Sequence, residues 1–498
     1  MIASALLVYS VLPSDKMPPA KDVKAAHAGD GDALSHKVKY LLVGGGTASY
    51  NALEAIREME VDPNVLVIGA EQSLPYQRPP LSKHCWSTVA ESPNAVTEDE
   101  VIYPGTELKT VEKLADASSG VNYLHGKVQS VDVEGSCVVL ADGSRVGYEK
   151  LLLATGVAPS PLEAVFSDVP APVADRIHTF HTLADFKRLS SKVLQGSGSV
   201  LIYGGGFLGS ELVAALANSV KNLEISQAFP EAGHFEKLFP AYLSKWTSDK
   251  ISQMGVKVFP RTRVTSVAES GEKSGLLVSA TQSPPPAADG KEKGPAMAVS
   301  IPANEIIVTD TVSANSSISG LPESCIDVNN GGFLVDSTLC MPDAKNVYAA
   351  GDVASYPQDG VHGRLEHHDN AVHQGRIAGV NMTGKGDPLE YTYQPAFWSE
   401  IGPDISFQGV GRIDADLVTV GVWAGEETAP QDGRGKTETN TEAYDRGVVF
   451  YVGKNRIVQG VLLWNMDPSQ ESVARRVLSR KKTIDDVPEV SRWFKIFD

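Results

Sequence analysis

Residues 38–49 read VKYLLVGGGTAS and residues 199–210 read SVLIYGGGFLGS, so the chain carries one pattern twice. In each copy an apolar run leads into three glycines. An acid follows the first glycine by 27 positions, Glu71 in the first copy and Glu231 in the second. A glycine turn lets the backbone approach a pyrophosphate, the next helix N-terminus stabilises its charge, and the acid accepts from a ribose hydroxyl. Two such patterns predict two bound dinucleotides, and hence hydride transfer from a nicotinamide to a flavin.

Composition and charge exclude several classes of function. At 498 residues and 42% hydrophobic content, the chain is long enough for two or three domains. The formal charge of -17 makes binding to nucleic acid or to an anionic membrane surface unexpected. The cysteines form no C-x-x-C pair, so neither a metal site nor a redox dithiol is expected; they are Cys85, Cys137, Cys325 and Cys340.

The N-terminal segment, residues 1–36, is expected to be a disordered linker. Its first 13 residues are apolar, but a membrane span needs about 20 residues, so no transmembrane span is predicted. The segment also lacks the Arg-rich, acid-poor character of a mitochondrial presequence.

The order of apolar runs predicts interleaved domains. Strands are expected at 38–43, 65–68, 150–156, 199–203 and 346–350, with a helix at 48–59 and another after the second glycine turn. The last of these strands ends in Gly351 and Asp352, and ligands bind beyond the carboxyl ends of parallel strands, so Asp352 is a candidate cofactor contact. Strands at 405–410, 417–423, 448–452 and 457–464 and a helix at 469–480 predict a separate C-terminal domain.

Five further strings carry a resemblance to a known family: LPYQRPPLSK at 74–83, GGGFLGSE at 204–211, EHHD at 366–369, FWS at 397–399 and VLLWN at 461–465. With them the chain resembles apoptosis-inducing factor from about residue 37 to its end. The resemblance implies an α/β fold of glutathione-reductase type, with two Rossmann-like domains and an α+β C-terminal domain. The implied limits are 37–176 and 307–388 for FAD, 177–306 for NAD, and 389–498 for the C-terminal domain.

The resemblance also implies an activity and a biology. Its members are FAD-dependent NADH oxidoreductases that pass hydride from NADH to FAD, form a long-lived charge-transfer complex with NAD, and dimerise on reduction. They lie in the mitochondrial intermembrane space, where they work with an import and assembly partner in respiratory-chain maintenance, and after release they act in caspase-independent cell death. Since no presequence is visible, the alternatives are a cytoplasmic or nuclear location after release, or a truncated gene model.

Site residues follow from the motifs and from this resemblance. Lys83 and Glu211 are expected to form a salt bridge beside the flavin, and Phe207 is expected to cover the flavin or stack on nicotinamide. The candidate catalytic residues are Lys83, Glu211, Phe207, His367 and Trp398. The candidate FAD contacts are Gly44, Gly45, Gly46, Thr47, Ala48, Ser49, Glu71, Arg78, Lys83, Val128, Asp352, His367, His368 and Trp398. The candidate NAD contacts are Gly204, Gly206, Phe207, Leu208, Gly209, Glu231, Lys237, Glu366 and Asn465.

For several candidates an ordinary structural role competes with the functional one. For Asn465 a turn asparagine is a serious competing explanation. For Arg78 the alternative is a turn arginine, and only the resemblance favours a phosphate contact. Adjacent residues do not share a helix face, so the Glu-His-His-Asp string at 366–369 is not expected to bind a metal. Glu231 favours NAD over NADP because a carboxylate repels the 2′-phosphate, although Lys237 leaves some ambiguity.

The chain departs from the family pattern at several points. Ser49 ends the first glycine turn where Gly or Ala is usual, His181 replaces an arginine, and the 309–315 segment lacks a glycine near Val312. Gln408 replaces a glutamate. The 93–102 stretch is too short for a regulatory hairpin, and the basic run before residue 366 is reduced to Arg364, so nucleic-acid binding is not expected.

Three other hypotheses stay open. The first is a ferredoxin or quinone reductase with fast turnover. The second is an NADH-gated interaction module whose turnover is incidental, and the third is a family member that has lost one cofactor.

Overall fold

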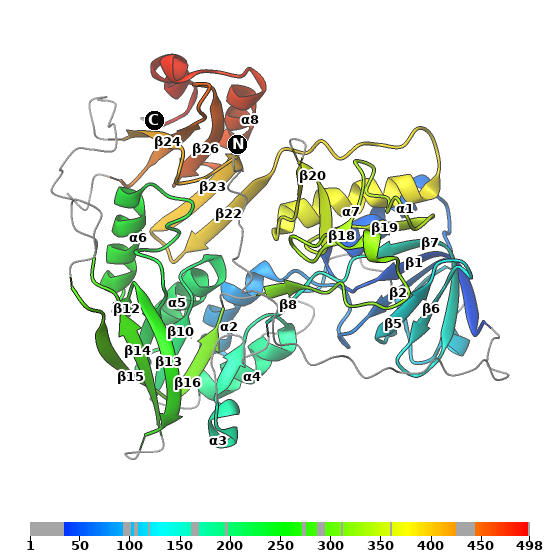
Figure 1. Ribbon diagram of the computed structural model, residues 1–498, viewed down its shortest axis with the longest axis horizontal. Coiled ribbons are helices and arrows are strands. Elements are labelled where there is room, and N and C mark those ends of the chain that lie inside the picture. The colour runs from blue at the N-terminus through cyan, green and yellow to red at the C-terminus, as the bar shows by residue number, and fades with distance from the viewer. Residues whose placement is uncertain are drawn as a thin grey trace. The chain divides into compact units, whose positions relative to one another are not determined.

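The computed structural model describes residues 34–92, 101–103, 108–117, 120–160, 169–194, 198–270, 275–285, 294–309, 312–358, 361–424 and 444–496 (Figure 1). The predicted N-terminal linker up to residue 33, most of the 93–102 stretch and residues 310–311 lie outside this part. The chain divides into two compact units. The first unit comprises Met1–Gln77, Ile102–Val157 and Ala314–Tyr393, and the second unit comprises Arg78–Val101, Ala158–Ser313 and Gln394–Asp498.

The first unit is built on a mixed sheet in the order β3-β4-β2-β1-β7-β6-β5. Its strands are β1 (His36–Val43), β2 (Val65–Gly69), β3 (Lys109–Val111), β4 (Val121–His125), β5 (Val128–Asp132), β6 (Cys137–Leu140) and β7 (Arg145–Leu153). β6 pairs with the start of β7 and β19 (Val347–Ala349) with its end. Strands β1, β2, β4 and the end of β7 run parallel, so their carboxyl ends meet at one edge.

Two helices of the first unit pack against each other through glycines. α1 (Thr47–Met59) follows the first glycine turn, and α7 (His368–Thr383) lies beside it (Figure 1). A Cβ on Gly375 would lie 2.3 Å from the Ala48 carbonyl oxygen, and one on Gly379 would lie 2.4 Å from that of Ala52. The helix backbones therefore approach more closely than any side chain would allow. The unit is completed by β18 (Phe333–Leu334), β20 (Ala354–Gln358), β21 (Val361–Gly363), and the 3₁₀ turns Leu114–Asp116 and Glu323–Cys325.

The second unit contains a parallel sheet in the order β12-β11-β10-β16-β9. Its strands are β9 (Ile177–Thr179), β10 (Ser199–Tyr203), β11 (Glu224–Ala228), β12 (Lys257–Phe259) and β16 (Glu305–Val308). An antiparallel sheet adjoins it in sequence: β13 (Thr262–Glu269), β14 (Leu276–Gln282) and β15 (Met297–Ala303). The helices are the 3₁₀ turn η1 (Pro79–Ser82), α2 (Cys85–Glu91), α3 (Ala171–Ala174), α4 (Leu183–Leu194), α5 (Phe207–Ser219) and α6 (Ala241–Gln253).

The C-terminal part of the second unit is an antiparallel sheet in the order β22-β23-β26-β25-β24. Its strands are β22 (Ala396–Ile401), β23 (Ile405–Gly411), β24 (Val418–Trp423), β25 (Gly447–Val452) and β26 (Val458–Trp464). α8 (Glu471–Ser479) packs its apolar side on this sheet and shares one core with Val410 and Val461. Short helical segments follow at Pro468–Gln470, Ile484–Asp486, Val487–Val490 and Ser491–Trp493.

The predicted fold class is confirmed, with small shifts in element limits. β7 begins at Arg145 and ends at Leu153, and β19 is confined to Val347–Ala349. The two short strands β8 (Val157–Pro159) and β17 (Val312–Ala314) pair where the chain passes between the two units. The three-domain limits drawn from the sequence stay a prediction.

Candidate active site

The first glycine turn connects β1 to α1 and is shaped for a close ligand. Gly44 has φ +117°, and a Cβ there would lie 2.1 Å from the Ala154 carbonyl oxygen, so only glycine fits. A Cβ on Gly46 would meet nothing within 4 Å. Gly46 caps α1 without a side-chain hydrogen bond, and the first turn holds no acid. The open amide end of α1 therefore fits an anionic pyrophosphate, as FAD carries.

Two tyrosines that the sequence reasoning missed hold Glu71 at the end of β2. The Tyr76 hydroxyl donates to Glu71 Oε2 at 2.7 Å. The Tyr123 hydroxyl lies 2.8 Å from the Glu71 carbonyl oxygen and 2.9 Å from that of Ser73. Tyr123 lies under the turn, because a Cβ on Gly45 would come within 3.0 Å of its hydroxyl. Glu71 is thus fixed where an acid for a ribose hydroxyl is expected.

Arg364 holds together two predicted cofactor contacts of the first unit. Its Nη1 donates to the Asp352 carbonyl oxygen at 2.7 Å, and its Nη2 donates to Glu366 Oε1 at 2.9 Å. A Cβ on Gly351 would lie 3.1 Å from the Ala48 Cβ, so Asp352 follows directly on a contact with the start of α1. The sequence had marked Arg364 only as the remnant of a basic run; the structure gives it a positioning role.

The Glu-His-His-Asp string lies at the start of α7. His367 is the N-cap of α7, and its Nδ1 accepts from the Asp369 N–H at 3.4 Å. His368 is the first helical residue. Val128, another candidate FAD contact, begins β5 and is buried in the core of the first unit. Among the described residues, no group of three or more His, Cys, Asp or Glu side chains is arranged to hold a metal ion.

The second glycine turn repeats the construction between β10 and α5. Gly204 has φ +138°, and a Cβ on Gly209 would lie 2.4 Å from the Gly204 carbonyl oxygen. Gly206 caps α5 without a side-chain hydrogen bond, and the first turn, which includes Leu208, holds no acid. This helix end therefore also fits a pyrophosphate.

The Glu231 carboxylate, which follows the second glycine turn, is a candidate acceptor for a ribose hydroxyl. Its backbone is fixed by the Arg261 N–H, which donates to the Glu231 carbonyl oxygen at 2.7 Å. Its Oε2 is buried and has no hydrogen-bond partner in the described part of the chain. Leaving a buried carboxylate oxygen unpaired costs free energy, and a ribose hydroxyl donor would satisfy it. The second turn with Glu231 thus fits a nicotinamide dinucleotide. Lys237 follows in the same loop, and its carbonyl oxygen accepts from the Ala415 N–H at 3.0 Å.

The expected ion pair between Lys83 and Glu211 is present and shielded. Lys83 Nζ lies 2.7 Å from Glu211 Oε2, with side-chain exposures of 12% and 8%. Ser82 and Ser399 hydroxyls also donate to this carboxylate, each at 2.6 Å. Lys83 Nζ lies 4.7 Å from the Trp398 ring centroid. Sequence reasoning missed the two serines, whose only signal is that each adjoins a predicted residue.

Phe207 lies at the edge of an aromatic cluster in the second unit. Its ring centroid is 5.3 Å from that of Phe397, 5.2 Å from that of Phe235 and 5.9 Å from that of Phe407. Phe207 is half-buried. Edge-to-face packing of this kind fixes a ring without hiding it fully, which suits a residue that covers or stacks on a cofactor ring.

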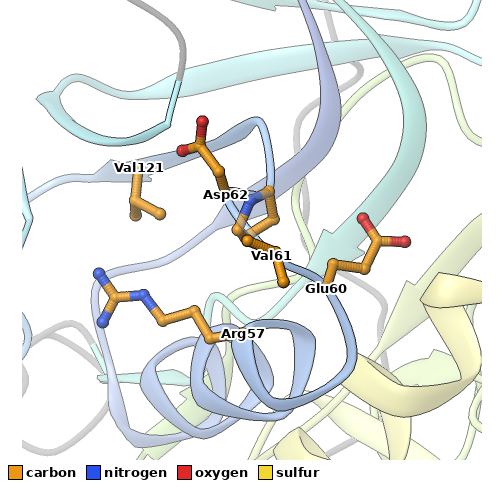
Figure 2. A pocket seen from close by; sticks show the side chains of 6 residues that line it. Arg57, Glu60, Val61, Asp62 and Val121 are labelled. Carbon is orange, nitrogen blue, oxygen red and sulfur yellow. The ribbon is translucent and has the colours of Figure 1, made fainter.

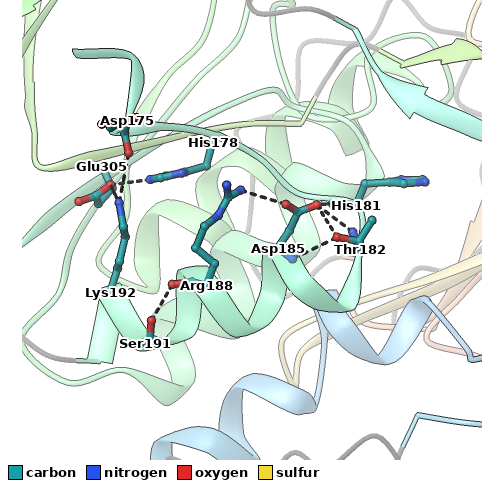
Figure 3. Close-up of polar contacts among 9 residues, drawn as sticks. All are labelled: Asp175, His178, His181, Thr182, Asp185, Arg188, Ser191, Lys192 and Glu305. Atoms are coloured by element: carbon teal, nitrogen blue, oxygen red, sulfur yellow. Dashed lines mark hydrogen bonds and ion pairs between the residues drawn. The ribbon is translucent and has the colours of Figure 1, made fainter. Parts of the chain in front are cut away.

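Arg78 is held by a loop at the start of α4. Its Nη1 donates to the His181 carbonyl oxygen at 2.7 Å. The backbone N–H groups of His181 and Thr182 donate to Asp185 Oδ2 at 3.1 and 3.0 Å, as Figure 3 shows. Asp185 thus fixes the carbonyl that orients the guanidinium. Whether this guanidinium then meets a phosphate stays a prediction.

Asn465 is engaged inside the C-terminal sheet. Its φ is +49°, its Oδ1 accepts from the Ser406 N–H at 2.6 Å, and its Nδ2 donates to the carbonyl oxygens of Asp404 and Asp445. These contacts are those of a turn asparagine, and its predicted contact with NAD has no support from them.

One hollow of about 470 Å³ in the first unit lies away from these residues (Figure 2). It is lined by Arg57, Glu60, Val61, Asp62, Pro63 and Val121. Arg57 lies at the end of α1, the next four of them lie in the loop that leads to β2, and Val121 begins β4. The hollow is therefore at the edge of the sheet opposite the glycine turn and includes none of the predicted site residues.

Comparison with known proteins places this geometry in a family. Residues 38–375 match the pyridine nucleotide-disulphide oxidoreductase family, and residues 378–440 and 426–480 match the mitochondrion-associated C-terminal domain of apoptosis-inducing factor. The chain is 32% identical to apoptosis-inducing factor 1, mitochondrial, of Dictyostelium discoideum, over 91% of this chain and 80% of that protein. The chain belongs to the apoptosis-inducing factor family. A putative apoptosis-inducing factor 1, mitochondrial, of Drosophila melanogaster is 31% identical, over 93% of this chain and 66% of that protein.

Membership of the apoptosis-inducing factor family makes the chain an FAD-dependent NAD(P)H oxidoreductase. Among solved structures, the ferredoxin reductase of Rhodopseudomonas palustris is similar with a TM-score of 0.68 at 23% identity, over 90% of this chain and 95% of that one. At this identity the likeness supports the fold alone. In the described part of the chain, no helix is long and apolar enough to cross a membrane.

Proposed function

We propose that the protein oxidises NADH in preference to NADPH, passes its hydride to bound FAD, and releases the oxidised coenzyme slowly. The coenzyme preference rests on the buried Oε2 of Glu231, beyond the second glycine turn, which has no hydrogen-bond partner among the residues that the structure describes. A carboxylate there accepts from the 2′-hydroxyl of NADH and repels the 2′-phosphate of NADPH.

FAD, when bound, supplies the acceptor for a two-electron transfer as hydride. The residues of this chain bind and orient the reactants. The amide end of α1 and Glu71 hold one dinucleotide, and the amide end of α5 and Glu231 hold the other. Glu211 accepts from Lys83, Ser82 and Ser399, so the carboxylate has one orientation and fixes the ammonium. A fixed positive charge stabilises negative charge that arrives on a neighbouring ring.

The coenzyme preference is tested with Glu231→Ala and a matched control. Glu236→Gln changes a second acid of the same loop while keeping an acceptor for the Ala232 N–H. We expect wild type and Glu236→Gln to bind NADH at least about tenfold more tightly than NADPH, and Glu231→Ala to lose most of that difference, because one charged hydrogen bond is worth about 1.5–3 kcal/mol. Equal preference in wild type and Glu231→Ala would remove the assignment.

We also propose a mitochondrial location, with an intermembrane-space partner, dimerisation on reduction and a part in cell death. The names of the Dictyostelium and Drosophila relatives support the mitochondrial location and the cell-death role. Fractionation of cells that express the tagged chain tests the location, and sedimentation with and without NADH tests the dimer. A cytoplasmic signal alone, or one sedimentation coefficient in both redox states, would contradict these assignments.

The second candidate is a reductase that delivers electrons to a ferredoxin or a quinone. A relative from Photorhabdus laumondii, named as the ferredoxin–NAD(+) reductase component of a dioxygenase and 27% identical over 76% of this chain, motivates it. Turnover that rises by orders of magnitude when a ferredoxin or a quinone is added would favour this function over slow coenzyme release.

A further inference from the structure

A chain of buried polar groups runs beneath the second glycine turn. Gln227, in β11, and His234, in the following loop, are both fully buried. Gln227 Nε2 donates to the Gly204 carbonyl oxygen at 2.7 Å, and Gln227 Oε1 lies 2.8 Å from His234 Nε2. His234 Nδ1 lies 2.8 Å from the Ser248 hydroxyl of α6. Buried polar groups are costly unless fully paired, so this chain has a single stable arrangement.

The Gly204 carbonyl group, at one end of this series of hydrogen bonds, determines the direction of each of them. A carbonyl only accepts, so the Gln227 amide must turn its NH₂ to Gly204 and its oxygen to His234. His234 Nε2 must then carry the proton. Burial lowers the pKa of His234 to about 3, so the ring is neutral and Nδ1 is an acceptor. The Ser248 hydroxyl has two acceptors within reach, His234 Nδ1 at 2.8 Å and the Ser244 carbonyl oxygen at 3.1 Å. With Nδ1 unprotonated, the single hydroxyl proton is directed to Nδ1, and the Ser248 oxygen accepts from the His234 backbone N–H at 3.1 Å.

The end of this chain fixes the peptide that opens the glycine turn. Gly204 has φ +138° and its N–H donates to the Ala228 carbonyl oxygen at 2.9 Å. With its carbonyl oxygen bound to Gln227, the whole Gly204–Gly205 peptide plane is set. In a trans peptide the next N–H points opposite to the carbonyl, so the Gly205 N–H is directed away from Gln227.

The same hydrogen-bonded groups connect the second glycine turn to the loop that carries Glu231. The His234 carbonyl oxygen accepts from the Ser244 hydroxyl of α6 at 2.7 Å. The Phe235 N–H lies 3.4 Å from the Gly205 carbonyl oxygen. Side-chain hydrogen bonds therefore connect three elements: helix α6, the loop that carries Glu231, and the second glycine turn. These elements are held together by hydrogen bonds as well as by packing.

We propose that Gln227 and His234 are positioning residues for the coenzyme, which hold the second glycine turn and the Glu231 loop in the conformation that binds the pyrophosphate and adenosine half of NADH. This inference rests on the proposed binding of NADH at that turn. It predicts an effect on coenzyme affinity and none on the hydride-transfer step, because neither side chain reaches the surface of the turn.

The test uses FAD-loaded protein and the variants Gln227→Leu, His234→Leu and His234→Gln. Thr247→Val is the matched control, because Thr247 is equally buried and its hydroxyl donates only to its own helix, to the Leu243 carbonyl oxygen at 2.8 Å. Binding of ADP-ribose, which carries no nicotinamide, is measured by calorimetry. The dissociation constant of NADH and the limiting rate of flavin reduction are measured by rapid mixing, and FAD content and unfolding temperature are recorded for each protein.

We expect Gln227→Leu and His234→Leu to weaken ADP-ribose and NADH binding by about tenfold or more, with an unchanged limiting rate and full FAD content. His234→Gln, which keeps a donor to Gln227, should recover most of the affinity. Thr247→Val should bind as wild type even if it unfolds earlier.

Wild-type affinity in Gln227→Leu, or an equal loss in Thr247→Val, would overturn the inference. If wild type itself binds neither ADP-ribose nor NADH, the proposed function fails instead, so the two failures are distinct.

Discussion

Lys83 and Glu211 form the most constrained charged pair of the predicted site. Each is almost enclosed, and the Glu211 carboxylate accepts two serine hydroxyls besides the ammonium. Replacing only one member of such a pair leaves the other charge without its partner, which costs more than the pair itself contributes.

Glu211→Ala should therefore lower the free energy of unfolding by about 3–5 kcal/mol and slow flavin reduction by NADH. Ser399→Ala removes one hydrogen bond to the same carboxylate and should cost only about 1 kcal/mol. Urea unfolding gives the first quantity and anaerobic rapid mixing the second. If both variants lost the same free energy of unfolding and the same rate of flavin reduction, the ion pair would contribute no more than a single hydrogen bond.

His234 makes stability depend on pH in a definite direction. Its pKa is lowered to about 3 by burial, below the ordinary value of 6.5. Between these values the unfolded chain binds a proton that the folded protein does not, so stability falls as pH decreases from about 6.5 towards 3, by up to about 1.4 kcal/mol per pH unit. Urea unfolding from pH 7 to pH 4 should show this slope in wild type and a smaller one in His234→Gln. Identical slopes would contradict it.

At the scale of elements, the packing of α1 on α7 depends on glycines of α7, which have no side chain. Gly379→Ala would place a Cβ 2.4 Å from the Ala52 carbonyl oxygen. Helix propensity alone favours alanine by about 1 kcal/mol, whereas overpacking costs about 1–3 kcal/mol or more. We expect destabilisation.

Arg376→Ala is the control for that substitution, because Arg376 lies on the same helix and forms an exposed ion pair with Glu58. It should change stability by less than about 1 kcal/mol. Thermal unfolding distinguishes the two variants; a Gly379→Ala protein more stable than wild type would show that the helices separate without cost.

The elements that carry their own signal could be predicted from the sequence. An apolar run that ends in glycines predicts β1 with α1 and β10 with α5. The supports of the site could not be predicted, because they join residues far apart in the chain. Nothing local distinguishes Tyr123, Gln227 or Arg364 from other residues of their strands and loops, and only the fold brings them to the glycine turns and to Asp352.

At the scale of the whole molecule, the two units divide the predicted machinery. The first unit holds the first glycine turn, Glu71, Asp352 and the start of α7, and the second unit holds the second turn, Glu231 and the Lys83–Glu211 pair. Two separate anion-binding helix ends, each with its own acid, fit two dinucleotides in one chain. That number is what an FAD-dependent oxidoreductase of nicotinamide coenzymes requires.

The most direct test is an anaerobic titration of the purified protein with NADH, followed by absorbance across the flavin bands and at long wavelength. We expect about one equivalent of NADH to bleach the flavin bands and to produce a long-wavelength band that persists after air is admitted, and we expect NADPH to be far less effective. Flavin bands unchanged by NADH, or a bleached flavin that reoxidises at once in air without a long-wavelength band, would contradict it.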